Sequence, residues 1–270
     1  MRLLAAAALK WVRPSAARPH LLAARPGSRR ALSSSSAAMA STQPQPRGAF
    51  IVFEGADRAG KSTQCQMLVE HLQAAGVAAE LWRFPDRTTA IGKMINSYLT
   101  SQADIDDAAV HLLFSANRWE KREELLRKLR AGTTLVVDRY AYSGVAFTAA
   151  KGAPGLDRAW CMSPDEGLPA PDAVFFLSLT VEQAAARGGY GEERYEKADF
   201  QRKVLEQFQA MRGSSWRVID ASQSIEDIQQ QLREQAAAVV ARCQRGGEPI
   251  KQLWGGEGGG APLAEIANVQ

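Results

Sequence analysis

The sequence has 270 residues and a mass of 29.3 kDa, with 46% hydrophobic and 23% charged residues, which is typical of a single globular domain with a buried core. Its formal charge of +4 is unevenly distributed, because eight of the 33 basic residues lie in residues 1–47, where there is no acid. The rest of the chain has 25 basic against 29 acidic residues, a formal charge of −4, which disfavours an overall basic surface for nucleic acid.

Two further classes of protein are disfavoured. No apolar run approaches the roughly 18 residues that a membrane-spanning helix needs. The three cysteines, Cys65, Cys161 and Cys243, are far apart and lack the spacing of metal ligands. We therefore expect no membrane span, no disulfide framework and no zinc site.

The N-terminal segment, residues 1–47, is rich in Arg, Ala and Ser, and the first acid of the chain is Glu54. This composition is typical of an organellar transit peptide, and a disordered arm is the alternative. Met39 offers a second start, because "MASTQPQPRGAFIVFEG" has no targeting character. We expect a mitochondrial full-length chain if the leader is a transit peptide, and a cytosolic or nuclear form if translation starts at Met39.

Apolar β-rich runs then alternate with segments of helical periodicity. Near-continuous apolar runs predict strands buried on both faces, in a parallel sheet that helices cover. Thr180 before Gln183 and Ser224 before Asp227 resemble capping boxes. We predict one doubly wound α/β domain over residues 48–254 and a flexible tail over 255–270. The expected strands are 49–54, 78–83, 133–138, 173–179 and 216–220, and the expected helices are 60–75, 89–100, 107–131, 143–150, 181–187, 197–212 and 224–243.

A phosphate-binding motif follows the first predicted strand. The sequence "GADRAGKS" fits G-x-x-x-x-G-K-[ST], between a buried strand and an amphipathic helix. Backbone N–H groups and the helix N-terminus can wrap a phosphate there. Lys61 would reach the β and γ phosphates of ATP, and Ser62 would ligate Mg²⁺. The predicted phosphate-binding residues are Gly55, Ala56, Asp57, Arg58, Ala59, Gly60, Lys61, Ser62 and Thr63.

Asp57 and Arg58 are unusual residues for such a loop. A carboxylate beside phosphates is unfavourable unless it faces a sugar hydroxyl, an Mg²⁺-bound water or a nearby arginine, which points to a second substrate close to the loop. Arg58 could neutralise charge that develops on a transferred phosphoryl group. The alternative is a salt bridge between the two that rigidifies the loop.

Several charged residues stand where predicted strands end. Arg83 and Arg87 flank "RFPDR" after the second strand, and Asp138 and Arg139 end the third. Ligands of parallel α/β sheets bind at the carboxyl ends of the strands, so we expect these side chains to converge there. The arginines would grip a second phosphate, and Asp138 would orient Mg²⁺ through water, unless each arginine is a solvated surface charge.

The long predicted helix 107–131 carries Phe114 and Arg118 on one face, four positions apart. This spacing suits an aromatic ring that stacks on a base and a guanidinium that bonds its carbonyl, or else core packing and a surface pair. Leu112 and Trp119 are predicted core residues. We assign no catalytic role to His71 or His111.

A glycine-rich, charged segment, "ARGGYGEERYE", lies between two predicted helices at residues 186–196. It is interpreted as a mobile lid that brings charge onto phosphates and excludes water, or as a solvated loop.

The ordered set of motifs resembles the thymidylate kinases of the eukaryotic type, which make dTDP from dTMP. The resemblance covers residues 48–254, and only the length of "GAPGLDRAWC" departs from it. It implies the P-loop nucleoside monophosphate kinase fold, with a five-stranded parallel sheet covered by helices and a short lid. It also implies a homodimer, with ATP, dTMP and Mg²⁺ as ligands and no nucleic acid or membrane. The motifs are "FEGADRAGKSTQ", "RFPDRTTAIG", "HLLFSANRWE", "LVVDRYAYSGVAFT", "PDEGLPAPD" and "ERYE".

The resemblance also implies roles for single residues. Asp57 would hold the 3′-hydroxyl of dTMP, Arg58 would assist transfer, and Arg87 and Arg139 would grip the monophosphate. Asp57, Arg58, Lys61 and Arg139 form the implied catalytic set. By the same resemblance, Phe114 would stack on thymine, Arg118 would bond its O4, and Phe84 and Phe147 would line the dTMP pocket. Tyr195 would crowd C2′, and Gln201 would contact the base through water. Arg187 would approach ATP, and Ala221 and Ser222 would lie near adenine.

Two rival functions stay open on the sequence. One is a kinase of another pyrimidine monophosphate or of deoxynucleosides. The other is a nucleotide-dependent switch protein without metabolic turnover, against which stand the second arginine cluster and the predicted lid. The favoured mechanism is direct in-line phosphoryl transfer without a covalent enzyme intermediate.

Overall fold

The computed structural model describes residues 45–187, 195 and 197–255. Most of the predicted leader, lid and tail lies outside these residues. No helix among them is long and apolar enough to cross a membrane.

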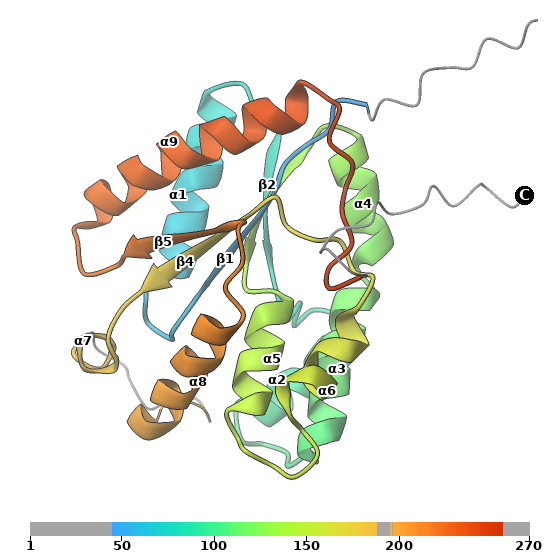
Figure 1. The fold of residues 1–270 in the computed structure, drawn as a ribbon, viewed down its shortest axis with the longest axis vertical. Helices are drawn as coiled ribbons and strands as arrows, with labels where there is room; N and C mark the ends of the chain where they lie inside the picture. Colours follow the sequence, from blue (N-terminus) through green and yellow to red (C-terminus); the bar gives the residue numbers. More distant parts are fainter. Residues whose placement is uncertain (1–44, 188–194, 196, 256–270) are drawn as a thin grey trace, which may run out of the picture. The chain divides into compact units, whose positions relative to one another are not determined.

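Five parallel strands form one sheet in the order β2-β3-β1-β4-β5, which confirms the predicted α/β class (Figure 1). Strand β1 is central, and the chain adds β2 and β3 on one side of it and β4 and β5 on the other. The order therefore reverses beside β1, and a ligand crevice is expected outside its carboxyl end. The strands are β1 (Phe50–Gly55), β2 (Ala79–Arg83), β3 (Thr134–Asp138), β4 (Ala173–Ser178) and β5 (Trp216–Asp220).

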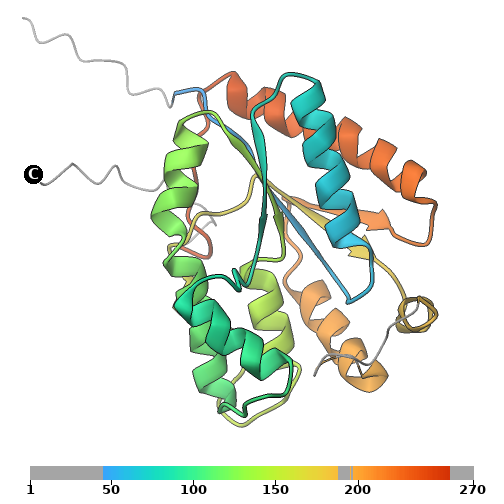
Figure 2. The same ribbon diagram turned by 180° about the vertical axis from the view of Figure 1, so that it is seen from behind.

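Helices cover both faces of the sheet (Figures 1 and 2). Helices α1 and α9 pack on one face, and α4, α5 and α8 pack on the other. The helices are α1 (Lys61–Ala74), α2 (Ala90–Leu99), α3 (Asp107–Trp119), α4 (Arg122–Arg130), α5 (Ala141–Ala149), α6 (Arg158–Met162), α7 (Val181–Ala185), α8 (Ala198–Ala210) and α9 (Ile225–Gln244), with a 3₁₀ turn at Ser163–Asp165.

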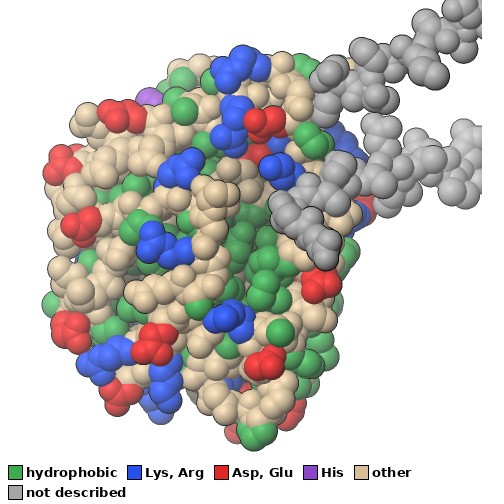
Figure 3. All heavy atoms as spheres, in the orientation of Figure 1, with side chains coloured by type: hydrophobic (Ala, Val, Ile, Leu, Met, Phe, Trp, Pro, Cys, Tyr) green, Lys and Arg blue, Asp and Glu red, His purple; other side chains and the backbone are tan. Residues whose placement is uncertain are grey.

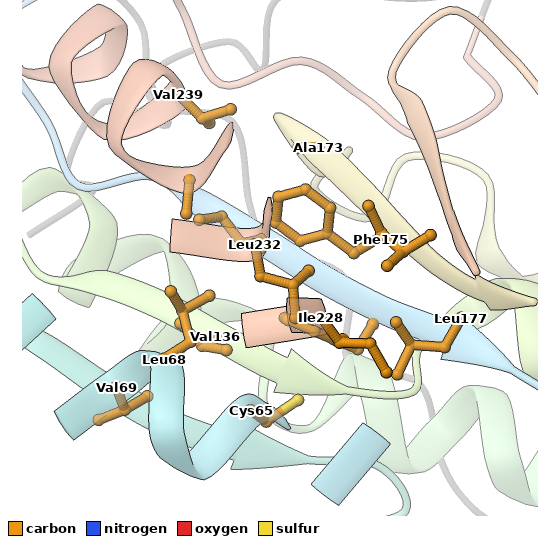
Figure 4. Close-up of a cluster of buried hydrophobic side chains, with 14 of the residues drawn as sticks. Cys65, Leu68, Val69, Val136, Ala173, Phe175, Leu177, Ile228, Leu232 and Val239 are labelled. Carbon is orange, nitrogen blue, oxygen red and sulfur yellow. The ribbon is translucent and has the colours of Figure 1, made fainter. Parts of the chain in front are cut away.

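The central strands are apolar on both faces because each face meets a helix layer. In β1, Ile51 and Phe53 belong to the core under α1 and α9, whereas Phe50 and Val52 belong to the opposite core. Figure 4 shows the first core, in which Leu68 of α1 and Leu232 of α9 lie beside the strands. This two-sided burial explains why the runs in β1, β3 and β4 are continuous rather than alternating.

The predicted helix 107–131 is wrong as a single element, because it divides into α3 and α4 at Glu120 and Lys121. The Lys121 N–H bonds the Arg118 carbonyl at 3.2 Å, a tightened i→i−3 bond that ends α3. The Glu120 carboxylate accepts from Thr89 at 2.7 Å and from Asn117 at 2.6 Å. These contacts, one of them with a distant residue, fix a break that periodicity does not reveal.

Leu112 and Trp119 are also not core residues, as they are 48% and 39% exposed. Both lie on the outward face of α3, whose inner face packs with α2 in a third apolar cluster that includes Ile95 and Val110. The outcome differs from the prediction because α3 packs on α2 and α5 through its other side chains.

The start of the folded part is tied to its end by Arg47, which the sequence places in the leader. Its guanidinium forms two bonds with Asp172, at 2.7 and 2.6 Å, and donates to the Glu248 carbonyl at 3.0 Å. Arg47 is only 5% exposed. Arg47 thus joins the start of the folded part to the loop before β4 through a buried ion pair, and to the C-terminal segment through a hydrogen bond.

The charges on the face seen in Figure 3 are interspersed by sign. All three cysteines are buried and free.

Candidate active site

A cleft of about 490 Å³ lies at the carboxyl ends of the strands, where the sheet order reverses. The loops after β1, β2 and β3 line it, together with α3, α5 and Tyr195. Among the predicted residues, those that line the cleft are Asp57, Arg58, Gly60, Lys61, Ser62, Thr63, Arg83, Phe84, Arg87, Phe114, Arg118, Asp138, Arg139, Phe147 and Tyr195.

The phosphate loop has the backbone that an anion site requires. Gly55 and Gly60 have φ of 141° and 90°, and Arg58 adopts φ of 64°. A Cβ at Gly55 would stand 2.5 Å from the Leu177 carbonyl oxygen, so glycine is required there. No side chain caps α1 at Gly60, so the N–H groups of its first turn are left for a ligand.

Lys61 is 6% exposed, and its ammonium donates to the carbonyls of Gly55 at 3.2 Å and Ala56 at 2.6 Å. Burial, and next the nearby positive charge of Arg139, lower the pKa of Lys61 to about 8. An anionic phosphate in the loop would oppose both effects. Bound phosphate should therefore favour the protonated form of Lys61 and raise its pKa.

Two side-chain oxygens that could bind a cation lie beside Lys61. The Ser62 hydroxyl donates to Asp138 at 2.6 Å, and Asp138 also pairs with Arg83 at 3.0 Å. Hydroxyl and carboxylate oxygens suit Mg²⁺, which usually keeps waters and takes phosphate oxygens as its other ligands. Within the described residues there is no cluster of three or more His, Cys, Asp or Glu side chains, so a cation here would depend on such outside ligands.

The partner of the unusual Asp57 carboxylate is Arg139. Their side chains form an ion pair, and the second Asp57 oxygen accepts from the Gln201 amide at 2.9 Å. Arg139 also has a strained backbone, with φ of 67°, and its guanidinium donates to Ser143 at 3.1 Å and lies 5.4 Å from the Phe147 ring. The nearby arginine, one of the partners that the sequence allowed for this carboxylate, is thus present.

Glu54 lies behind the site as a supporting residue that sequence reasoning missed. It is fully buried and accepts from the backbone N–H of Tyr140 at 3.0 Å and of Ser143 at 3.1 Å, and from the Ser143 hydroxyl at 2.5 Å. Burial raises the pKa of Glu54. Its carboxylate caps α5, which explains why this helix begins two residues before the predicted position. Only its place next to Gly55 could have signalled it.

Asp165 is a second missed residue, and it holds Arg118. The guanidinium donates to both Asp165 oxygens, at 3.0 and 2.6 Å, and the two side chains are 2% and 0% exposed. Gly144 makes room for this fork, because a Cβ there would come within 2.9 Å of it. The motif "PDEGLPAPD" contained this aspartate, but its partner is 47 positions away.

Five of the predicted ATP-binding and dTMP-binding residues do not line the cleft, and neither do Ala221 and Ser222. Gly55, Ala56 and Ala59 are buried in the loop, and Gln201, which is 2% exposed, lies behind Asp57. Arg187 bonds the carbonyls of Arg58 at 3.0 Å and Ala221 at 2.6 Å, and so joins the phosphate loop to the loop after β5. Gln201 and Arg187 therefore support the site from behind.

The surroundings of His111 are those of a packed core residue. It is buried between the Thr148 hydroxyl and the Cys161 carbonyl, each 2.9 Å from a ring nitrogen. Burial lowers its pKa, so the ring is held neutral.

The comparisons with known proteins agree on one family. The sequence model described as thymidylate kinase matches residues 53–232. A human thymidylate kinase is 52% identical over 211 residues, which cover 77% of this chain and 98% of the human protein. An Arabidopsis thaliana thymidylate kinase is 51% identical over 210 residues, covering 78% of each chain. The solved structure of thymidylate kinase from Candida albicans superimposes with a TM-score of 0.70 at 37% identity, over 77% of this chain and 99% of the other.

Proposed function

Since the chain belongs to the thymidylate kinase family, we propose that it transfers the γ-phosphoryl group of MgATP to dTMP, with dTDP and ADP as products. The observation that carries this proposal is that one cleft contains both a phosphate loop and a second set of cations with aromatic side chains. A switch protein needs only the first. A monophosphate kinase needs both, brought within one transfer distance.

The donor ATP binds at the phosphate loop. The N–H groups at the start of α1 and the ammonium of Lys61 face its phosphates, and Lys61 exchanges the carbonyls of Gly55 and Ala56 for phosphate oxygens. Arg58 of this loop lines the cleft and faces the phosphoryl group that is transferred. Arg187 holds the loop's shape through the Arg58 carbonyl.

The Mg²⁺ ion that accompanies ATP would be held by Ser62 and, through water, by Asp138. Their mutual bond of 2.6 Å already places two oxygens side by side at the start of α1. When bound, the ion supplies charge neutralisation of the β and γ phosphates.

The acceptor dTMP occupies the other half of the cleft. Arg87 and Arg139 bind its phosphate, and Asp57 accepts from the sugar 3′-hydroxyl. Phe114 stacks on thymine with Phe84 and Phe147 around it, and Arg118 donates to O4. Tyr195 forms the wall beside C2′. Arg139 thus links both substrates, because it contacts Asp57 and the Gly55 carbonyl at 3.3 Å.

In the transfer step an oxygen of the dTMP phosphate attacks the γ-phosphorus, and the bond from that phosphorus to the bridging oxygen of ADP breaks. No general base is required, because the attacking oxygen is already ionised at neutral pH. Lys61, Arg58 and Arg139 stabilise charge on the transferred group, while the remaining residues position the substrates.

We also propose a homodimer through α3. The exposed Leu112 and Trp119 share one face of that helix with Ala116, and Met94 of α2 is 52% exposed. Sedimentation of the protein over a range of concentrations tests this, and a monomer throughout would refute it.

For the leader, we propose mitochondrial import of the full-length chain and a cytosolic or nuclear form from Met39. The support is the acid-free composition of residues 1–47. N-terminal sequencing of the protein from mitochondrial and cytosolic fractions tests the proposal. One identical N-terminus in both fractions would exclude separate forms.

Steady-state kinetics with MgATP and dTMP, dUMP, UMP, dCMP or GMP test the proposed activity, on the full chain and on a chain starting at Met39. The second start retains Arg47, which pairs with Asp172 before β4 and bonds the Glu248 carbonyl near the end of the domain. We expect the highest kcat/KM for dTMP. Tight ATP binding without turnover of any acceptor would favour the switch protein instead.

A further inference from the structure

Tyr195 is held by side chains from three helices. Its hydroxyl donates to the Tyr98 hydroxyl of α2 at 3.1 Å, and its ring stacks on Phe200 of α8, with centroids 5.3 Å apart and an angle of 17°. Phe147 of α5 lies 5.4 Å from the same ring. The Tyr195 carbonyl accepts from Gln201 at 3.0 Å. Both ends of this residue are therefore fixed.

An ammonium group completes this arrangement. Lys151, just after α5, donates to the Tyr98 hydroxyl at 3.1 Å and to Asp107 at 2.6 Å. Its nitrogen lies 5.4 Å from the centre of the Tyr98 ring and 5.3 Å from that of Tyr195. The Lys151 side chain is only 11% exposed, whereas lysines are usually at the surface. The cost of this burial is offset by the carboxylate, the hydroxyl and two aromatic faces.

Neither Tyr98 nor Lys151 lines the cleft, but Tyr195 does. The Gln201 amide bonds both the Tyr195 carbonyl and the Asp57 carboxylate, which places Tyr195 beside the residue that takes the 3′-hydroxyl in the proposed function. The C2′ carbon adjoins C3′, so an added 2′-hydroxyl would meet this wall. A wall rejects one extra hydroxyl only if it cannot move by a few tenths of an ångström.

We propose that Tyr98 and Lys151 are positioning residues that set the preference for 2′-deoxyribose over ribose by keeping Tyr195 in place. The proposal rests on the proposed function. It adds a specificity determinant outside the substrate pocket, which acts through the hydroxyl of Tyr195 and through the cation over its ring.

The test uses the full chain with Tyr98→Phe and Lys151→Met, which remove the polar contacts and keep the apolar bulk. The acceptors are dUMP and UMP, which differ only in the 2′-hydroxyl. We expect the dUMP-to-UMP ratio of kcat/KM to fall about fivefold to tenfold in each variant, the effect of losing one hydrogen bond. Lys93→Met, on the exposed side of α2, is the matched control and should leave the ratio unchanged.

A double-mutant cycle separates positioning from general damage. Tyr195→Phe and Tyr98→Phe both remove the bond between the two hydroxyls, and Tyr98→Phe also removes the bond from Lys151. Tyr195→Phe should therefore lower the ratio too, and the double variant should be no worse than Tyr98→Phe alone. Equal losses of kcat/KM for dUMP and UMP, or an unchanged ratio, would overturn the inference while dTMP phosphorylation by the wild-type chain upholds the function. If wild-type protein phosphorylated no monophosphate, the function and the inference would both fail. Should Lys151→Met not fold, as thermal unfolding would show, Tyr98→Phe and Tyr195→Phe still decide the question.

Discussion

Because the amine of Lys61 is buried, we predict that the protein takes up a proton when it binds ATP at alkaline pH. The pKa of Lys61 is lowered to about 8 in the ligand-free chain, from an ordinary value of 10.5, because the amine is buried and faces Arg139. Phosphate oxygens in the loop favour the charged form, so the pKa in the complex should return toward the ordinary value. A shift of this size corresponds to about 3 kcal/mol between the two protonation states.

The sign and size of the effect follow from linkage. At pH 9 about a tenth of the free protein carries a protonated Lys61, whereas nearly all of the complex does, so each bound ATP takes up about 0.9 proton. The Kd for ATP should therefore rise about tenfold between pH 7 and pH 9. The phosphates of ATP themselves do not contribute above about pH 8, because their second ionisation lies near pH 6.

Calorimetric titration with the magnesium complex of a non-hydrolysable ATP analogue measures both quantities, when it is run in buffers of different ionisation enthalpy. Lys61→Arg is the matched control, because a guanidinium stays charged throughout this range. Its Kd should be almost independent of pH. A wild-type Kd that changes less than about twofold between pH 7 and pH 9, without proton uptake, would refute the reasoning.

Three further predictions concern the support of the site. Gly144→Ala should raise the KM for dTMP about tenfold with little change in the KM for ATP, because the new Cβ would come within 2.9 Å of the Arg118 guanidinium; steady-state kinetics with an unchanged KM for dTMP would contradict this. Asp165→Asn should lower the free energy of unfolding in urea by about 3–5 kcal/mol, because it leaves the buried Arg118 charge without its partner. The Asp199 side chain is 94% exposed, so the control variant Asp199→Asn should change the free energy of unfolding little. The lowered pKa of His111 means that the unfolded chain takes up a proton that the folded chain excludes, so stability should fall as the pH drops below about 6.5; thermal unfolding between pH 7.5 and pH 5.5 would show this slope, and its persistence in His111→Gln would assign it to another group.

Features that depend on neighbouring residues could be predicted from the sequence. The five strands follow from apolar runs, and the phosphate loop follows from eight consecutive residues between a strand and a helix. Parallel pairing then brings Asp138 and Arg139 to the same edge as Lys61. Each inference requires only periodicity, the conformational freedom of glycine and the geometry of a parallel sheet.

The tertiary structure alone decided how the site's charges are paired. Asp57 meets Arg139 across 82 positions, Arg118 meets Asp165 across 47, and Glu54 caps α5 across 86 and 89. The same holds for the break between α3 and α4 and for the exposure of Leu112 and Trp119, which follow from what packs against each face. Local patterns constrain the backbone over one or two elements, whereas the partner of a buried charge is set by the packing of distant elements, which no local pattern encodes.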